Sequence, residues 1–217
     1  MQNFNILKIM KQIVSLLALC VTAVLAVWMV TETQKKSGVI EAIEARRSIR
    51  DYKDTPVERE KLQIIAECGV KAPSARNLQE WEVRIVDSKE WIDACTATYL
   101  KSVEGTDKAK HMLTPTFKNI FRNASAVIFV AAPEGLFSGV NVGMLGENMM
   151  LAATELGLGT CCLGSVQMTF AEPAMAEYLS SLGFSEGYKL SYALAVGYPN
   201  ESPEAKPRDM AKIKFVE

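Results

Sequence analysis

A short basic stretch, RRSIR at residues 46–50, is the first part of the chain whose residue types could do chemistry. A guanidinium offers a rigid fork of donors that matches a phosphate group, and the serine hydroxyl adds a further donor. A second basic pair, Lys206 and Arg208, lies near the other end of the chain. Each stretch is also compatible with an ordinary solvated surface. The residues therefore indicate an anion-binding site without requiring one.

A loop motif, APSARNLQEW at residues 72–81, could contact a flat heterocycle. Its proline and small residues let backbone amides approach a ligand, and its Asn and Gln side chains carry both donors and acceptors. A plain connection between a helix and a strand is the alternative interpretation, and the motif alone does not separate the two.

A glycine-rich segment, LGLGTCCLGS at residues 156–165, is superficially similar to a dinucleotide-binding motif. The comparison fails because Cys162 stands where the third glycine is needed, and because the segment follows a predicted helix instead of a strand. Gly157 is typical of the residue that ends a helix. The segment is therefore no evidence for a dinucleotide fold.

The elements that must position these motifs follow from hydrophobic periodicity and from end signals. Thr55, Pro56 and Glu58 supply an N-cap, a proline at the first helical position and a glutamate three residues after the cap. They predict a helix that begins here and continues through residue 69. Residues 126–132 form a continuous apolar run typical of a central strand. The other expected elements are helices at 39–46, 138–156 and 171–182 and strands at 82–86 and 188–199.

The order of these elements predicts the α+β class, because helices outnumber strands and do not alternate regularly with them. The helix at 138–156 is apolar almost all round. Such a helix must be buried in the core or against a second subunit.

Composition narrows the function classes. The chain has 217 residues with 24 basic and 25 acidic side chains, so it carries no field that would attract nucleic acid. Its single histidine, His111, would have to carry any histidine triad or histidine-rich metal site alone, and we interpret it as a surface residue. Five cysteines without CxxC spacing argue against a disulfide framework and against zinc. We interpret Cys68 and Cys95 as small buried residues on helices.

The N-terminal segment, residues 1–37, is interpreted as a signal peptide or membrane anchor followed by a polar linker. Lys8 and Lys11 precede an uncharged apolar run at residues 13–30, which matches the roughly 18 to 20 residues that span a bilayer. A cleavable signal and a retained anchor both stay open, and Cys20 adds lipidation as a third possibility. These features predict export or anchoring at the bacterial cell envelope, on the periplasmic side, without excluding the cytoplasmic face.

Four motifs, in this order along the chain, resemble the nitroreductase family of FMN-dependent NAD(P)H oxidoreductases. They are RRSIRDYKDTPV (46–57), APSARNLQEW (72–81), ENMMLAATELGLGTCCLGS (147–165) and VGYPNESPEAKPR (196–208). The resemblance implies a nitroreductase-like α+β fold over residues 38–217, with a central, mainly antiparallel sheet surrounded by helices. It also implies a homodimer with FMN at the interface, so that some residues of one chain serve the partner's FMN.

The resemblance also carries cofactor-binding roles over to the matching positions. It implies that the FMN phosphate and ribityl chain are bound by Arg46, Arg47, Ser48, Arg50, Lys206 and Arg208. The isoalloxazine ring would lie along Pro73, Ser74, Ala75, Asn77 and Gln79, with Leu163 and Gly164 near its reactive edge. Departures from the family pattern stand at Glu80, Asn141, Glu147 and Cys162. They bear on pocket lining and interface, and so on the substrate class more than on FMN binding.

The implied activity needs no catalytic side chain and no metal, because the cofactor carries the difficult chemistry. Our hypothesis is a ping-pong cycle in which NAD(P)H reduces FMN and leaves, and a nitroaromatic, quinone or similar small acceptor then takes the electrons. Arg50 is the candidate for a positive charge near the flavin N1 and O2 atoms. The alternatives are an exported flavin-binding or electron-relay protein that uses another reductant, and a specialised relative of the dehalogenase or flavin-destructase type.

Overall fold

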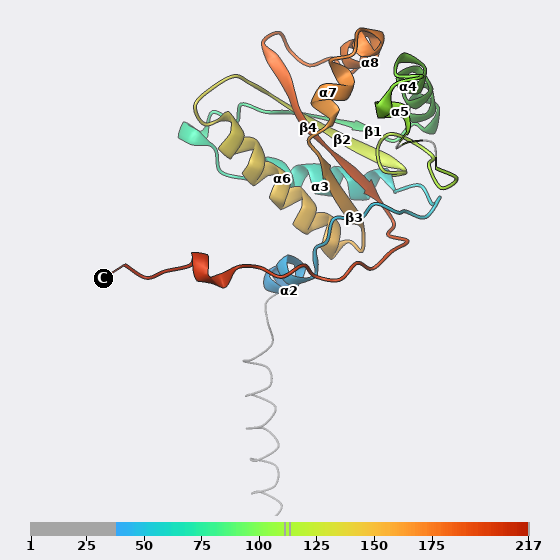
Figure 1. The fold of residues 1–217 in the computed structure, drawn as a ribbon. Coiled ribbons are helices and arrows are strands. Elements are labelled where there is room, and N and C mark those ends of the chain that lie inside the picture. The colour runs from blue at the N-terminus through green and yellow to red at the C-terminus, as the bar shows by residue number, and fades with distance from the viewer. Residues whose placement is uncertain (1–37, 111, 113, 217) are drawn as a thin grey trace, which may run out of the picture. The chain divides into compact units, whose positions relative to one another are not determined.

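The computed structural model describes residues 38–110, 112 and 114–216 (Figure 1). The helices are α2 (Gly38–Ala45), α3 (Arg59–Val70), α4 (Lys89–Ser102), α5 (Asp107–Lys110), α6 (Ser138–Glu155), α7 (Val166–Phe170) and α8 (Ala176–Ser181). Short 3-10 turns are η1 (Ala75–Asn77), η2 (Pro173–Met175) and η3 (Met210–Lys212). The strands are β1 (Glu82–Val86), β2 (Ala126–Pro133), β3 (Gly159–Leu163) and β4 (Tyr188–Gly197).

Two of the sequence predictions fall outside the described residues: the signal peptide or anchor at residues 1–37, and the surface position of His111. Within the described part of the chain, no helix is long and apolar enough to cross a membrane. The compact unit that contains the sheet comprises Ala42–Glu217. The domain boundary placed at residue 38 stays a prediction.

The four strands form one antiparallel sheet in the order β1-β2-β4-β3. Every residue of β2 except its last, Pro133, is buried, which accounts for the uninterrupted apolar run that predicted this strand. β2 pairs with β4 through a register irregularity between Val130 and Ala131. The predicted α+β class with an antiparallel sheet is confirmed.

Helices α3 and α6 cover one face of this sheet (Figure 1). Leu62 and Ile65 of α3 are buried with Leu145 and Met149 of α6, and this cluster includes Ile128 of β2. The predicted amphipathic face of α3 is therefore the face that packs on α6 and the sheet.

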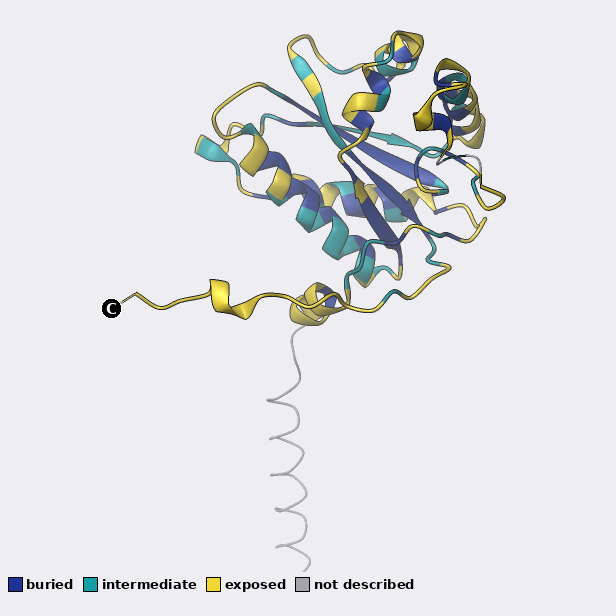
Figure 2. Cartoon of the chain, in the orientation of Figure 1, coloured by how far each residue is buried: buried dark blue, intermediate teal, exposed yellow. Residues whose placement is uncertain are grey.

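The opposite face is covered by α4, α7 and the segment around Phe121. Phe129 of β2 stands at its centre, with ring centroids 5.9 Å from Trp91, 5.7 Å from Phe121 and 5.6 Å from Phe170, each edge to face. Figure 2 shows the buried strands between the two helical layers. Cys95 of α4 is buried in this cluster, and burial raises the pKa of its thiol to about 12.

Helix α3 begins at Arg59, three residues later than Pro56, so the predicted start was wrong. Val57 is buried, and Glu58 is extended with φ −62° and ψ 134°. The Glu58 carboxylate accepts from the Tyr198 hydroxyl instead of capping the helix. Packing of Val57 and the link to Tyr198 thus override the local capping signal.

Two further predictions were wrong. The helix expected over 171–182 is interrupted at Pro173: Glu172 is extended before the proline, the turn η2 follows, and α8 begins only at Ala176. Cys68 of α3 is only partly buried, not buried. The strand β3 and the helix α7, which flank Gly164, were not predicted at all.

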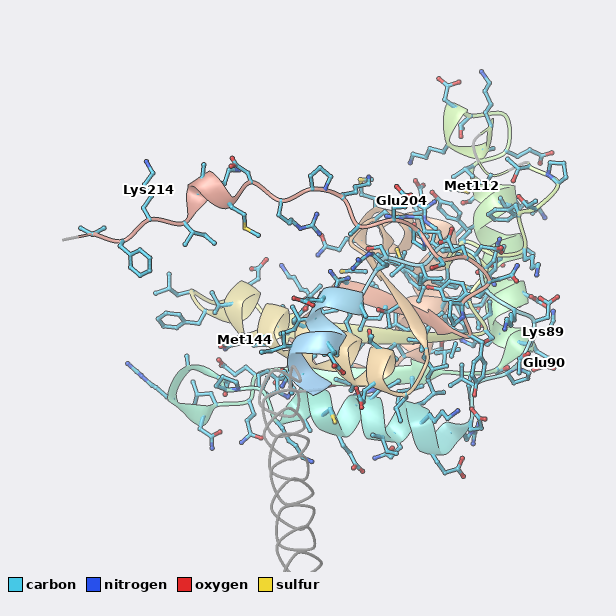
Figure 3. The ribbon with its side chains drawn as sticks, turned by 90° about the horizontal axis from the view of Figure 1, so that it is seen from below. Lys89, Glu90, Met112, Met144, Glu204 and Lys214 are labelled. Atoms are coloured by element: carbon cyan, nitrogen blue, oxygen red, sulfur yellow. The ribbon has the colours of Figure 1, made fainter. Side chains whose placement is uncertain are left out.

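Residues 200–216 form a C-terminal segment in which nearly every side chain is exposed. Met210, Ile213 and Phe215 are 70%, 72% and 97% exposed, although all three are apolar. Figure 3 shows Lys214 on a stretch that stands apart from the sheet and its helices. These apolar side chains are not covered by any other part of the chain that the structure describes.

Candidate functional site

The basic stretch 46–50 follows α2 and runs along the edge of β3. Ser48 forms a parallel bridge with Thr160, and the Ile49 N–H donates to the Thr160 carbonyl at 2.9 Å. Gly159 permits this approach, because a Cβ there would lie 2.7 Å from Cγ1 of Ile49. Burial of Ile49 therefore fixes the backbone from which the neighbouring arginines extend.

Two of the arginines in this stretch are held by their own surroundings. The Arg46 side chain is 22% exposed, and its Nε lies 3.6 Å from Oε1 of Glu147 on α6. Arg47 donates to the carbonyl oxygens of Glu44 at 2.6 Å and Arg46 at 2.8 Å, so its guanidinium closes the end of α2. Arg47 would have to leave these carbonyls to take the phosphate role implied by the sequence.

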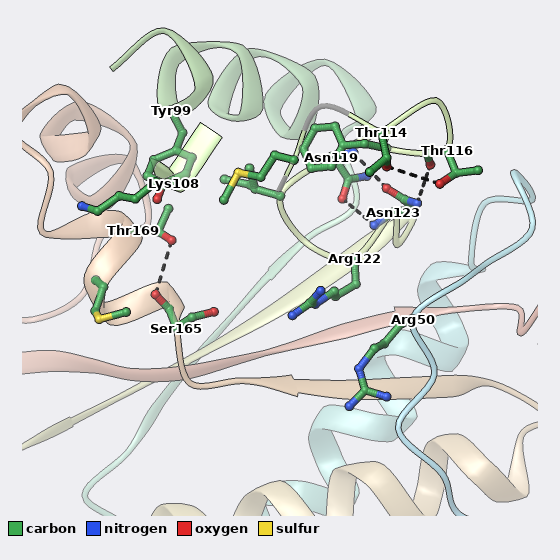
Figure 4. Close-up of a pocket in the computed structure, with 14 residues that line it drawn as sticks. Arg50, Tyr99, Lys108, Thr114, Thr116, Asn119, Arg122, Asn123, Ser165 and Thr169 are labelled. Atoms are coloured by element: carbon green, nitrogen blue, oxygen red, sulfur yellow. Dashed lines mark hydrogen bonds between the residues drawn. The ribbon is translucent and has the colours of Figure 1, made fainter. Parts of the chain in front are cut away.

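Arg50 is different, because its guanidinium makes one local hydrogen bond, to the Ser48 carbonyl at 3.1 Å. Its backbone N–H donates to the Glu201 carboxylate at 2.5 Å, which holds the main chain and leaves the side chain exposed. The side chain lines a cavity of about 470 Å³ that also includes Ser165, at the turn between β3 and α7 (Figure 4). Most of the Arg50 donors are thus open to a ligand in this cavity.

The loop at 73–79 has a strained backbone. Arg76, Asn77 and Gln79 all have positive φ, at 55°, 55° and 51°. Non-glycine residues rarely adopt this conformation, and it persists only where surrounding contacts impose it. Most contacts here are local: the Asn77 N–H donates to the Ser74 carbonyl at 2.9 Å, and the Gln79 N–H donates to the Ser74 hydroxyl at 2.9 Å. From outside the loop, Oδ1 of Asn141 accepts from the Ala75 N–H at 3.2 Å.

Among the residues that the structure describes, Asn141 is the buried side chain that anchors this loop. It lies on the first turn of α6 and is 1% exposed. Its Oδ1 holds the loop, while its buried Nδ2 has no hydrogen-bond partner in the part of the chain that the structure describes. The side chains of Pro73, Asn77 and Gln79 are exposed. The loop therefore presents polar groups outward from a distorted backbone.

One chain brings only some of the predicted site residues together. Arg50 and the turn that follows Leu163 and Gly164 meet at the cavity, through Ser165. The loop at 73–79 does not line that cavity. Lys206 and Arg208 lie on the exposed C-terminal segment, where Arg208 donates to the Lys206 carbonyl at 3.1 Å. Arg46 and Arg47 line a different pocket, which Glu201 also lines. The predicted set is thus divided among four places in one chain.

Cys161, on β3 below the cavity, is not an activated nucleophile. Burial raises the pKa of its thiol above its ordinary value, while Arg50 and Arg122 act in the opposite direction. The net effect keeps the thiol protonated at neutral pH, since only the thiolate is strongly nucleophilic.

Comparison with known proteins decides the family. The Nitroreductase family model matches residues 43–198, which is most of the chain. The chain belongs to the nitroreductase family. Its relatives include the "NADPH-flavin oxidoreductase" of Vibrio harveyi, 28% identical over 82% of this chain and 72% of that protein. Another is the "FMN reductase [NAD(P)H]" of Bacillus subtilis (strain 168), 31% identical over 78% of this chain and 69% of that protein.

Solved nitroreductase structures share the fold. The FMN-bound nitroreductase of Desulfitobacterium hafniense DCB-2 aligns with a TM-score of 0.74 at 29% identity, over 84% of this chain and 100% of its own. The FMN-bound nitroreductase of Bacteroides fragilis NCTC 9343 aligns with a TM-score of 0.74 at 26% identity, over the same shares. The resemblance read from four sequence motifs is confirmed.

Sequence reasoning missed the residues that this nitroreductase chain places around the cavity from the segment before β2. They come from residues 108–123 and include Lys108, Asn119 and Arg122. A signal did exist: the polar stretch FKNIFRNAS at 117–125 directly precedes the most buried strand of the protein. It carries two basic residues and two carboxamides where a plain connection would need neither.

Proposed function

We propose that this nitroreductase is an FMN-dependent oxidoreductase that takes electrons from NAD(P)H and passes them to a small acceptor. Relatives named for NADPH-flavin oxidoreductase and FMN reductase activity support the proposal, as do two similar structures that contain FMN. One observation in this chain carries it. The Arg50 guanidinium keeps open donors in a cavity whose described lining contains no Asp or Glu.

The residues present fit FMN by their chemistry. FMN presents a phosphate, a ribityl chain of hydroxyls and a ring edge that becomes negative on reduction. Guanidinium groups suit the phosphate and the ring edge, because both accept charge-assisted hydrogen bonds. The open donors of Arg50 and the outward polar groups of the loop at 73–79 can donate hydrogen bonds to such acceptors. A buried carboxylate, which would oppose an anionic ligand, is absent from the described cavity lining.

We place the phosphate and ribityl chain on the basic stretch, with the C-terminal pair completing the site. The residues are Arg46, Arg47, Ser48, Arg50, Lys206 and Arg208. The isoalloxazine ring lies on the turn at Leu163 and Gly164 and on the loop of Pro73, Ser74, Ala75, Asn77 and Gln79. Because one chain separates these groups, we propose a homodimer in which a second copy completes each site.

When bound, FMN supplies the redox chemistry, accepting electrons from the nicotinamide and giving them to the acceptor. The chain's own part is to bind, orient and stabilise charge. Arg50 offsets negative charge on the ring edge, and the protonated Cys161 stays out of proton transfer. Nicotinamide and acceptor use the same cavity in turn, which is a ping-pong order. A nitroaromatic or quinone suits a cavity with Met112, Met168 and Ile120 in its walls.

The N-terminal segment supports a location at the cell envelope, with residues 13–30 serving as export signal or anchor. That location raises the question of the reductant, because nicotinamide is a cytoplasmic cofactor. The test must therefore be able to reveal the alternative, an electron-relay protein of the same fold that is reduced by a compound other than NAD(P)H.

Anaerobic stopped-flow mixing tests the proposal. The purified protein is mixed with NADH and, separately, with NADPH, and flavin absorbance is followed. We expect rapid bleaching with at least one of them, and slower bleaching in the variant Arg50→Ala. Arg59→Ala is the matched control, because Arg59 is 83% exposed and pairs with Asp87 away from the cavity. A flavin that neither nucleotide bleaches would refute nicotinamide dependence.

A further inference from the structure

The cavity beside Arg50 is more basic than FMN binding by Arg50 requires. Its described lining includes three basic side chains, Arg50, Lys108 and Arg122, and no acidic one. Lys108 is offset by Glu172, whose carboxylate lies 2.5 Å from its Nζ. The positive charges of Arg50 and Arg122 are therefore not offset by a carboxylate in the described lining, and the cavity attracts anions.

Arg122 is the basic side chain of this cavity that has no partner. Within the described residues, no hydrogen bond or ion pair joins its guanidinium to another group, whereas Arg50 contacts the Ser48 carbonyl. Figure 4 shows the Arg122 side chain extending from its loop into the space between Arg50 and Ser165. Arg50 and Arg122 both line this cavity together with Ser165, at the turn between β3 and α7. A guanidinium held in a cavity without an acceptor is suited to an anionic ligand.

The backbone that carries Arg122 is distorted and firmly held. Arg122 has φ 58° and Asn123 has φ 65°. Asn119, which is 8% exposed, accepts from the N–H groups of Phe121 and Asn123 at 3.0 Å each and donates to the Ala124 carbonyl at 3.1 Å. A buried carboxamide thus maintains the left-handed conformation that directs Arg122. Strain kept in place by a buried network is typical of a functional position.

The walls around Arg122 suit a flat apolar molecule. Met112, Met168, Phe117 and Ile120 supply apolar and thioether surface, and the hydroxyls of Thr114, Thr116, Ser165 and Thr169 lie among them. Thioether side chains adapt to aromatic surfaces. A ligand that fits both the walls and the charge is an aromatic ring with a carboxylate or sulfonate.

We propose that Arg122 is a specificity-determining residue that selects aromatic acceptors bearing an anionic group. This inference rests on the proposed function, because the selected molecule is the acceptor of that reaction. The anionic group itself does not react. For a nitroaromatic acid, NAD(P)H supplies two electrons and one hydrogen as a hydride equivalent and solvent supplies one proton. The nitro group becomes a nitroso group, and one oxygen leaves as water.

The test compares two acceptors of nearly equal size, para-nitrobenzoate and para-nitrobenzamide, which differ in charge. Steady-state kcat/KM is measured for each with saturating NAD(P)H. The FMN-loaded wild type should prefer the benzoate by roughly tenfold, the expected size of one charge-assisted contact. The variant Arg122→Gln should lose this preference by losing activity on the benzoate alone. Arg122→Lys should keep part of it.

A matched control removes a positive charge from the same segment without touching the cavity. Lys118 lies four residues before Arg122 and pairs with Asp54 at 2.6 Å. Lys118→Gln should leave the ratio of the two acceptors unchanged. Equal use of benzoate and benzamide by the wild type would overturn the inference. So would an Arg122→Gln variant that loses FMN and slows with both acceptors alike, since Arg122 would then serve the cofactor.

Calorimetric titration of the purified protein with para-nitrobenzoate separates this inference from the proposed function. Tight binding that weakens in Arg122→Gln supports an anion site even if neither nucleotide reduces the flavin, in which case only the proposed function fails. Turnover of the benzamide with no binding preference for the benzoate supports the proposed function and refutes the role of Arg122.

Discussion

Two strained loops in this protein differ in how they are held. The loop at 116–123 and the loop at 73–79 both contain non-glycine residues with positive φ. The first is fixed by two carboxamides, Asn119 and Asn123, whose bonds stay within their own segment. The second has one buried anchor, Asn141, and otherwise faces outward. The first loop is therefore braced mainly by its own side chains, while the second keeps its strained backbone with one buried side-chain contact from outside the loop.

The largest effect is expected from the self-supported loop. Asn119→Ala removes three hydrogen bonds and leaves two backbone donors and one acceptor without partners, so unfolding free energy should fall by about 3 kcal/mol. Denaturant unfolding measures this change. Asn77→Ala, at the same type of residue in the outward loop, should change it by less than about 0.5 kcal/mol. Similar losses in the two variants would remove the distinction between the loops.

A smaller effect is expected at the single anchor of the outward loop. Asn141→Ala deletes the acceptor for the Ala75 N–H, so unfolding free energy should fall by about 1 kcal/mol. The variant should also bind FMN more weakly, because the loop at 73–79 is no longer held in position by Asn141. Fluorescence of released flavin measures the second effect. Unchanged FMN affinity would show that the position of the loop does not matter to the cofactor.

Relief of strain should have a modest effect of opposite sign. Arg76→Gly allows φ 55° without steric cost, so we expect a gain of about 0.5 kcal/mol in stability. The outward loop should accept the change without loss of fold, since the Arg76 side chain is exposed. Thermal unfolding gives the measurement. A lower melting temperature would indicate that this side chain makes a stabilising contact.

Sequence patterns predicted the parts of the fold whose signal is local. The apolar run of β2 and the alternation of β1 became strands at the expected residues. The start of α3 was misplaced because its cap signal competes with the packing of Val57, a tertiary effect. β3 was missed because its first residue, Gly159, has weak strand propensity, and only the close approach of Ile49 explains why a glycine stands there.

The site was predictable only where motifs were continuous. The order of four motifs was enough to identify the family, and Arg50 does lie at a cavity. Arg122 and Asn119 were not found, because their roles depend on a left-handed turn that no local pattern announces. Only the structure shows that the predicted site residues lie in separate places, because sequence order does not reveal which groups a single chain can bring together.

The smallest expected effect is on the pH dependence of the free energy of unfolding. Neither loop should contribute to it, because the carboxamides that hold the loops carry no charge. The Asp87 carboxyl accepts from Arg59, and this bond holds its pKa below its usual range. Stability from Asp87 is therefore present above its unfolded pKa of about 3.9 and is lost as pH falls through the lower folded value. Asp87→Asn should flatten the acid side of the stability profile slightly. If Asn119→Ala instead flattened the profile of stability against pH, the claim that the loops do not contribute to the pH dependence would be wrong.

The central claim is that basic residues from both ends of the domain hold FMN. The direct test is the flavin content of purified protein, measured by absorbance and by chromatography of the released cofactor, in wild type and in the double variant Arg46→Ala, Arg208→Ala. The account predicts a yellow wild type with FMN stoichiometric with the chain, and a folded double variant that has lost it. A colourless wild type, or a double variant that keeps FMN at full occupancy, would contradict the account.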